Sequence, residues 1–158
     1  MVRAARYAYF ALAWAFVAGV VLQVFFIGLG LFAASEYRQL HADFGWTILH
    51  LWPLLILVAA PLARAGRTRI LQAAALAITV WIVPILAVLR VDAPVAAAFH
   101  PVGALLAFWL AILVARGATS LVGSTDTEAT PTRGEWAVVA VVVVILLFLS
   151  FSGSPTEA

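Results

Sequence analysis

Residues 95–116, VAAAFHPVGALLAFWLAILVAR, decide the fold that we expect for this chain. The only ionisable side chains in this stretch are a histidine near its start and the arginine that ends it. At a rise of about 1.5 Å per residue, a helix of this length crosses the roughly 30 Å hydrocarbon core of a bilayer. The stretch therefore predicts a membrane-spanning helix with one histidine close to one membrane face.

Four other apolar runs have the same character, and short clusters that hold nearly all the charged residues separate them. The expected spans are residues 7–32, 44–63, 70–89, 95–115 and 136–151. Only 10% of the chain is charged, against roughly 25% in an average soluble domain, which excludes a water-soluble domain. We predict an all-α, polytopic integral membrane bundle. Two antiparallel hairpins form its four-helix core, and a fifth, C-terminal transmembrane helix follows.

A polar segment divides the chain. Residues 117–134 are rich in Thr, Ser and Gly and contain Asp126 and Glu128, which is typical of a flexible linker. We therefore expect the four-helix core in residues 1–116, a cytoplasmic linker in 117–134, and the fifth helix with a short outer tail in 135–158. Because the fifth helix has no polar side chain before Ser150, we interpret it as a lipid-facing anchor.

The arginines predict the orientation of the helices, since cytoplasmic loops of membrane proteins carry an excess of basic residues. With a cytoplasmic N-terminus, Arg38 and Arg90 lie outside and the other seven basic residues, all arginines, lie inside. We therefore expect a multi-pass protein of a prokaryotic plasma membrane with the N-terminus in the cytoplasm. The net charge of +2 follows from this topology and does not indicate a nucleic-acid partner.

The two predicted hairpins look like copies of one unit, a pattern that often marks binding sites in membrane proteins. Each outer connection carries an arginine, each leads into a histidine, and a glycine follows each histidine by about one turn. The residues are Arg38, His41 and Gly45 in the first hairpin, and Arg90, His100 and Gly103 in the second. This repeat makes these residues the candidate site.

Histidines that start the second and fourth helices can face each other across a four-helix bundle, as in bis-imidazole ligation of haem. We expect His41 and His100 to be the axial ligands of a haem b, and Arg38 and Arg90 to pair with its propionates. Both glycines would let the macrocycle approach the helix backbones. With three histidines, no cysteine and one methionine at position 1, the chain can hold only one such haem.

The predicted function is a single-haem b-type membrane cytochrome that transfers electrons near the outer membrane face. Its expected partners are the bilayer and a redox protein or quinone, and it can act as a homo-oligomer or as a subunit of a larger redox complex. The alternative is a non-catalytic membrane protein that packs with partner proteins or lipids without a cofactor. In that case, both histidines are interfacial residues that bond to headgroups or carbonyls.

Two further interpretations concern the remaining polar residues. A non-haem metal site at the outer surface has candidate ligands in Glu36, His41, Asp43 and His100, although their spacing matches no metal signature, and Asp43 also suits the N-cap of the second helix. His50 lies nine residues beyond His41. That spacing places it about 13.5 Å deeper and on the opposite face of an ideal helix. We expect His50 to be buried and bonded to the carbonyl of Trp46 or to Gln23.

The segments HADFG at residues 41–45 and FHPVGALLAFWLA at residues 99–111 resemble a family of small uncharacterised prokaryotic four-helix membrane proteins, a domain of unknown function. The likeness covers residues 8–116. The two outer histidines are also distantly similar to those in one half of haem A synthase, whose four-helix halves each hold a histidine pair. This resemblance implies that His41 and His100 are haem ligands. Haem A synthase has two such halves and cysteines in an outer loop, whereas this chain has one half and no cysteine.

Overall fold

The computed structural model describes residues 1–124 and 130–152, the last two by their backbone alone. This part of the chain is helical and contains no strand. Within it, five segments are long and apolar enough to cross a membrane: Val2–Phe32, Tyr37–Leu62, Arg67–Val88, Pro94–Gly123 and Arg133–Ser150. The predicted all-α architecture with five helices of spanning length is confirmed.

The first span is the continuous helix α1, Val2–Phe32. The second is divided into α2, Tyr37–Phe44, a π-helical turn η1, Gly45–Leu49, and α3, Trp52–Leu62. Pro53 causes part of this division, because it has no N–H to donate to the carbonyl of Leu49. The amide of His50 bonds five residues back, to the carbonyl of Gly45, at 2.9 Å.

The remaining elements follow a tight turn in which Arg64 and Gly66 adopt φ angles of 52° and 79°. They are α4, Arg67–Val88, α5, Pro94–Ala97, α6, His100–Gly123, and α7, Arg133–Ser152. Pro101 lies in the first turn of α6, where a missing N–H costs no helical hydrogen bond. The fourth span is therefore a short helix and a long one, joined at Ala98 and Phe99.

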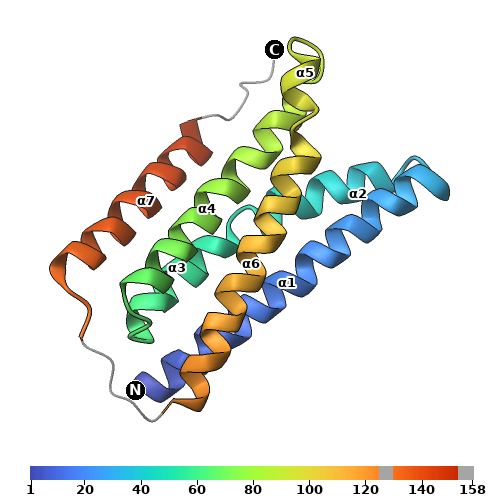
Figure 1. Cartoon of the computed structure of the whole chain (residues 1–158). Coiled ribbons are helices and arrows are strands. Elements are labelled where there is room, and N and C mark those ends of the chain that lie inside the picture. Colours follow the sequence, from blue (N-terminus) through green and yellow to red (C-terminus); the bar gives the residue numbers. More distant parts are fainter. Residues whose placement is uncertain (125–129, 153–158) are drawn as a thin grey trace.

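Four helices form a ring in which α1 and α4 each pack against both α3 and α6. Figure 1 shows α7 lying alongside α4, and α7 also packs against α3. Val139 and Leu146 of α7 are buried. The fifth helix is therefore docked on the core through one face, while most of its apolar side chains, such as Val141, Val144 and Phe148, are exposed.

The core is concentrated at one end of the ring, which we call the arginine end because Arg6, Arg64 and Arg69 lie there. Apart from Gly30, the buried residues of α1 lie between Arg6 and Val17. Those of α6 lie between Ala107 and Leu121. At the opposite end, the histidine end, which holds His41 and His100, the α1–α2 hairpin diverges from α4 and α6 (Figure 1).

Arg6 joins three helices at the arginine end. Its side chain is 8% exposed. Its guanidinium donates to the carbonyl oxygens of Ala63 at 3.4 Å, Leu121 at 3.3 Å and Ser124 at 3.0 Å. These oxygens belong to the C-terminal ends of α3 and α6, where carbonyls lack helical donors and the helix dipole is negative. One buried cation therefore fastens α1 to the ends of two other helices.

Helix α6 continues beyond the predicted span and ends at Gly123. The polar residues that suggested a linker are compatible with the helix, because their hydroxyls bond to its own backbone. Thr119 donates to the carbonyl of Ala115, and Ser120 donates to that of Gly117. The acidic part of the expected linker, with Asp126 and Glu128, lies outside the described residues, as does the expected outer tail at 153–158.

We predict that Arg6→Leu destabilises the protein by about 2 to 3 kcal/mol, because it leaves buried carbonyls without their charged donor. In a chain of this size, that loss lowers Tm by about 5 to 10 °C. Thermal unfolding in a mild detergent measures the shift. The control is Arg3→Leu, which removes an exposed arginine from the same helix. Equal Tm values for the two variants would show that the Arg6 contacts do not stabilise the bundle.

Candidate functional site

His41 of α2 is held by a single residue of α1. Its Nδ1 lies 3.0 Å from the backbone carbonyl oxygen of Gln23. The side-chain amide of Gln23 donates to the carbonyl of His41 at 2.8 Å and lies 3.5 Å from its Nε2. Because a carbonyl oxygen can only accept, the proton of the neutral ring is on Nδ1. Nε2 is then the acceptor nitrogen, and the side-chain amide of Gln23 is its donor.

His100, the first residue of α6, makes the same bond in the second hairpin. Its Nδ1 lies 2.8 Å from the backbone carbonyl oxygen of Val83 in α4. The acceptor lies 17 residues before the histidine, and in the first hairpin the separation is 18. The same reasoning places the proton on Nδ1 and leaves Nε2 unprotonated. The repeat inferred from sequence thus extends to the hydrogen bonds of both histidines.

The two glycines contact the same two acceptor residues. A Cβ atom at Gly45 would lie 2.7 Å from Nε2 of Gln23, and one at Gly103 would lie 2.9 Å from Cγ2 of Val83. The glycines therefore allow the two helices of each hairpin to approach closely. We call each set of His, Gly and acceptor residue a hairpin clamp. The side chains of Gln23 and Val83 fill the space that we expected a macrocycle to use.

The two outer arginines differ from each other. Nε of Arg38 donates to the carbonyl of Gly30 at 3.0 Å, and its aliphatic chain packs on that glycine, where a Cβ would lie 2.7 Å from Cγ. Arg38 thus bonds within its own hairpin. Arg90 is exposed in the connection between α4 and α5. Both arginines are exposed, and the bond of Arg38 to Gly30 uses only its Nε.

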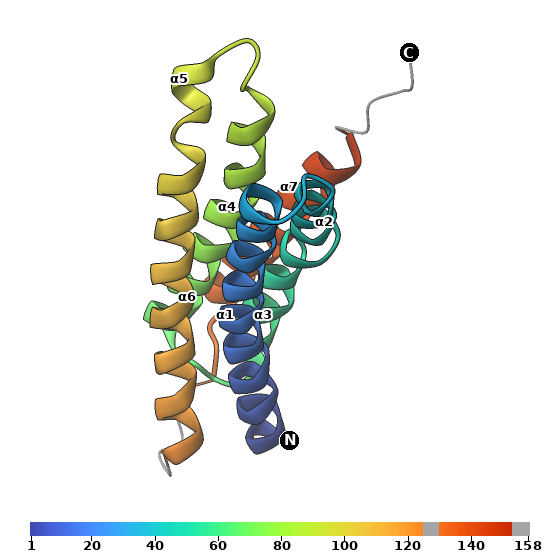
Figure 2. The same ribbon diagram turned by 90° about the vertical axis from the view of Figure 1, so that its right-hand side faces the viewer.

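The histidines stand on separate hairpins. His41 is bonded to α1 and His100 to α4. In both views, α2 lies apart from the corner between α5 and α6 where His100 is located (Figure 2). Within residues 1–124 and 130–152, no group of three or more His, Asp or Glu side chains is placed to hold a metal ion.

Asp43 does not cap a helix N-terminus, which corrects the interpretation from sequence. The helix begins earlier, at Tyr37, so Asp43 lies in its last turn. Its Oδ1 accepts from the side-chain amide of Gln39 at 2.7 Å. Residues 37–42, several of which are polar, are also helical. The N-terminus of this helix is therefore at Tyr37 and not at Asp43.

His50 is buried, as expected, with 6% of its surface exposed. Its partner is neither Gln23 nor the carbonyl of Trp46, because its Nε2 lies 3.5 Å from Oγ of Ser150 in α7. The same Oγ accepts from Nε1 of Trp81 at 3.1 Å. The imidazole lies beside the rings of Trp46 and Trp81, with centroid distances of 5.1 and 5.7 Å. Ser150 is the residue that sequence reasoning missed, and its isolated polarity in an apolar run was the available signal.

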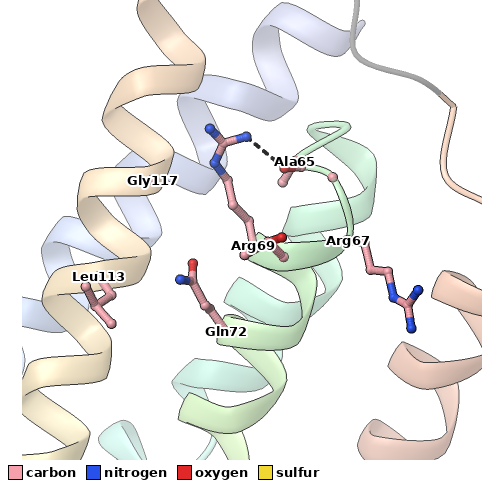
Figure 3. Close-up of a pocket in the computed structure, with 8 residues that line it drawn as sticks. Ala65, Arg67, Arg69, Gln72, Leu113 and Gly117 are labelled. Carbon is pink, nitrogen blue, oxygen red and sulfur yellow. Dashed lines mark hydrogen bonds between the residues drawn. The ribbon is translucent and has the colours of Figure 1, made fainter.

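A hollow of about 420 Å³ opens at the arginine end between α4 and α6 (Figure 3). Its lining includes Arg69, Gln72, Leu113 and Gly117. Arg69 extends toward Gly117, and its guanidinium donates to the carbonyl of Ala65 at 2.9 Å and to Oγ of Ser120 at 3.1 Å. Arg67 points away from α6. The hollow is therefore basic, and Arg69 links the start of α4 to α6.

The glycines of the hairpin clamps give a stability prediction. Gly103→Ala should destabilise the protein by about 1 to 2 kcal/mol, because the new methyl group meets the branched side chain of Val83 in a packed contact. Gly45→Ala should cost less, since the flexible end of Gln23 can move. The control is Gly28→Ala in α1, where a Cβ meets nothing within 4 Å. Thermal unfolding in detergent ranks the variants, and a Gly103 variant as stable as the control would contradict the close contact.

Comparison of the chain with models of protein families, with curated proteins and with solved structures finds no match. The functional argument therefore starts from the geometry of this chain. Its two distinguishing features are the repeated hairpin clamps at the histidine end and the buried cluster of His50, Trp81 and Ser150.

Proposed function

We propose that this chain is a multi-pass membrane protein that binds one haem b through Nε2 of His41 and of His100, and that it acts as a single-haem b-type cytochrome. One observation carries the proposal. In both hairpin clamps, Nδ1–H bonds to a backbone carbonyl. Metal-ligating histidines usually donate their second ring N–H to a carbonyl or carboxylate, which fixes the tautomer and ring orientation. Two imidazoles with unprotonated Nε2 atoms are a donor set for bis-histidine haem iron, and at His41 the side-chain amide of Gln23, 3.5 Å from Nε2, would have to move aside.

The arrangement of the helices supports a ligand that joins the two hairpins. In the ring of four helices, α3 and α6 stand on opposite sides, and α1 and α4 lie between them. Helix α2, which carries His41, belongs to the same span as α3. The hairpins diverge at the histidine end, and several large apolar side chains there are exposed, including Val24, Phe25 and Leu105. An apolar macrocycle held by one imidazole from each hairpin would use such surfaces.

The two glycines add nothing to this support, because contacts inside the hairpins occupy Gly45 and Gly103. Arg38 and Arg90 are both exposed, and the bond of Arg38 to Gly30 uses only Nε, so either guanidinium can pair with a carboxylate. The proposal therefore rests on the two imidazoles, with Arg38 and Arg90 as candidate partners for the propionates.

In this proposal, the bound haem supplies one-electron chemistry, and the chain holds and orients it. The hairpin clamps fix the orientation of each imidazole and the direction of its Nε2. Five apolar helices support a bilayer environment, and the gathering of arginines at one end supports a cytoplasmic N-terminus in a prokaryotic plasma membrane. The redox partner is a quinone or a second redox protein, either free or within the same complex.

The second candidate function is a membrane protein that packs with partners or lipids without a cofactor. The observation that favours it is that the hairpin clamps account for both histidines and both glycines as contacts between helices of one hairpin. The two candidates differ in the result of a single spectroscopic experiment.

Protein expressed with a supply of haem and purified in mild detergent should show a sharp α band in its dithionite-reduced minus oxidised spectrum. His41→Gln and His100→Gln should each abolish this band. Glutamine can still donate an N–H to the carbonyl of the clamp, so circular dichroism should remain helical. His50→Gln, which changes the histidine outside the clamps, should keep the band.

A colourless, helical wild-type protein that remains colourless on titration with haem would overturn the cytochrome and leave the packing function. A band that survives in either clamp variant would show that the haem has another ligand.

A further inference from the structure

The cluster around His50 contains a polar atom that the fold leaves without a partner. His50 lies where η1, α4 and α7 meet, and its Nδ1 is buried and has no hydrogen-bond partner in the described part of the chain. Buried polar atoms are bonded in the great majority of cases, and an ionisable side chain at membrane depth is a functional candidate by default. A π-helical turn, a feature that occurs frequently at functional sites, ends immediately before His50.

The contacts of Ser150 define which nitrogen carries the proton. Its hydroxyl donates to the carbonyl of Leu146 at 2.8 Å, so its single proton is used. Oγ therefore acts as an acceptor toward Nε1 of Trp81 and toward Nε2 of His50. A neutral His50 consequently has its proton on Nε2, and Nδ1 is a buried lone pair.

Two tryptophan rings lie beside the imidazole of His50. The centroids of the Trp46 and Trp81 rings lie 5.1 and 5.7 Å from that of His50, and indole faces attract a cation within about 6 Å. The side chains that lie against the His50 ring, those of Trp46, Trp81 and Ser150, are uncharged.

Helix α3 and η1 contain no charged side chain, and those of α4 and α7 stand in the first turns of these helices: Arg67 and Arg69 in α4, Arg133 and Glu135 in α7. Helices α1 and α2 also pack against η1. The charged or titratable side chains of α2, Arg38, His41 and Asp43, lie seven or more residues before His50, and the charged side chains of α1, Arg3 and Arg6, lie near its N-terminus.

We propose that His50 is a proton-binding site inside the membrane and that α7 completes it, so that protonation of Nδ1 and docking of α7 favour each other. A charged imidazolium donates a stronger hydrogen bond to Oγ of Ser150 than a neutral ring does. Because coupling between two binding events is reciprocal, a docked α7 raises the affinity of His50 for the proton. The proposal does not depend on haem.

The direct test is ¹⁵N NMR of the full chain, labelled at its histidines, in detergent micelles between pH 8 and pH 4. The His50 signals are identified by their loss in His50→Gln. We expect the Nε2–H tautomer at pH 8 and protonation of Nδ1 as the pH falls. An Nδ1–H tautomer at pH 8, or a ring that stays neutral at pH 4, would overturn the site.

The coupling to α7 is tested with Ser150→Ala, which should move the His50 titration at least 0.5 pH unit lower, about a threefold loss of proton affinity. Ser150→Thr keeps the hydroxyl and should titrate like wild type. Thr119→Ala is the matched control, because Thr119 accepts from Trp14 and donates to its own helix, both at 2.9 Å, in the same manner as Ser150. An unchanged titration in Ser150→Ala would show that α7 is not part of the site.

Discussion

The buried guanidinium of Arg6 is the contact on which the arrangement of the helices depends. It holds the start of α1 against the carbonyl ends of α3 and α6, so three of the four ring helices are fixed at the arginine end. The buried parts of α1 and α6 follow directly from that point. Because the ring is closed at one end, the two hairpins can diverge at the other, where both candidate haem ligands stand.

The hairpin clamps join the two helices within each hairpin, whereas Arg6 joins helices of different hairpins. Each fastens the second helix of a hairpin to the first by one imidazole bond and one glycine contact, and both act on the same residue, Gln23 or Val83. The histidines are thus fixed within their hairpins, while the relation between hairpins is determined at the arginine end. Because contacts within the hairpins and contacts between them lie at opposite ends of the bundle, the two imidazoles have matching bonds but stand apart from each other. A ligand between the hairpins would be the element that joins them.

Two further contacts show how polar groups are used among apolar helices. In each, a tryptophan N–H donates to a hydroxyl whose own proton bonds to the carbonyl four residues back: Trp14 with Thr119, and Trp81 with Ser150. Such bonds between helices stabilise association where lipid offers no hydrogen-bonding partner. The first joins α1 to α6. The second joins α4 to α7, and it differs because His50 lies beside it.

The sequence by itself determined the number and approximate limits of the spanning helices, because hydropathy over about 20 residues is a local property. It also identified the repeat, since matching residues can be read directly. It misplaced boundaries at Tyr37 and Gly123, where polar residues continue a helix by bonding to their own backbone or to near neighbours. Only the tertiary structure decided that Arg6 is buried, that the candidate ligands stand on separate hairpins, and that His50 meets Ser150, 100 residues away. These features depend on how helices rotate and pack, and that is determined by contacts between distant segments.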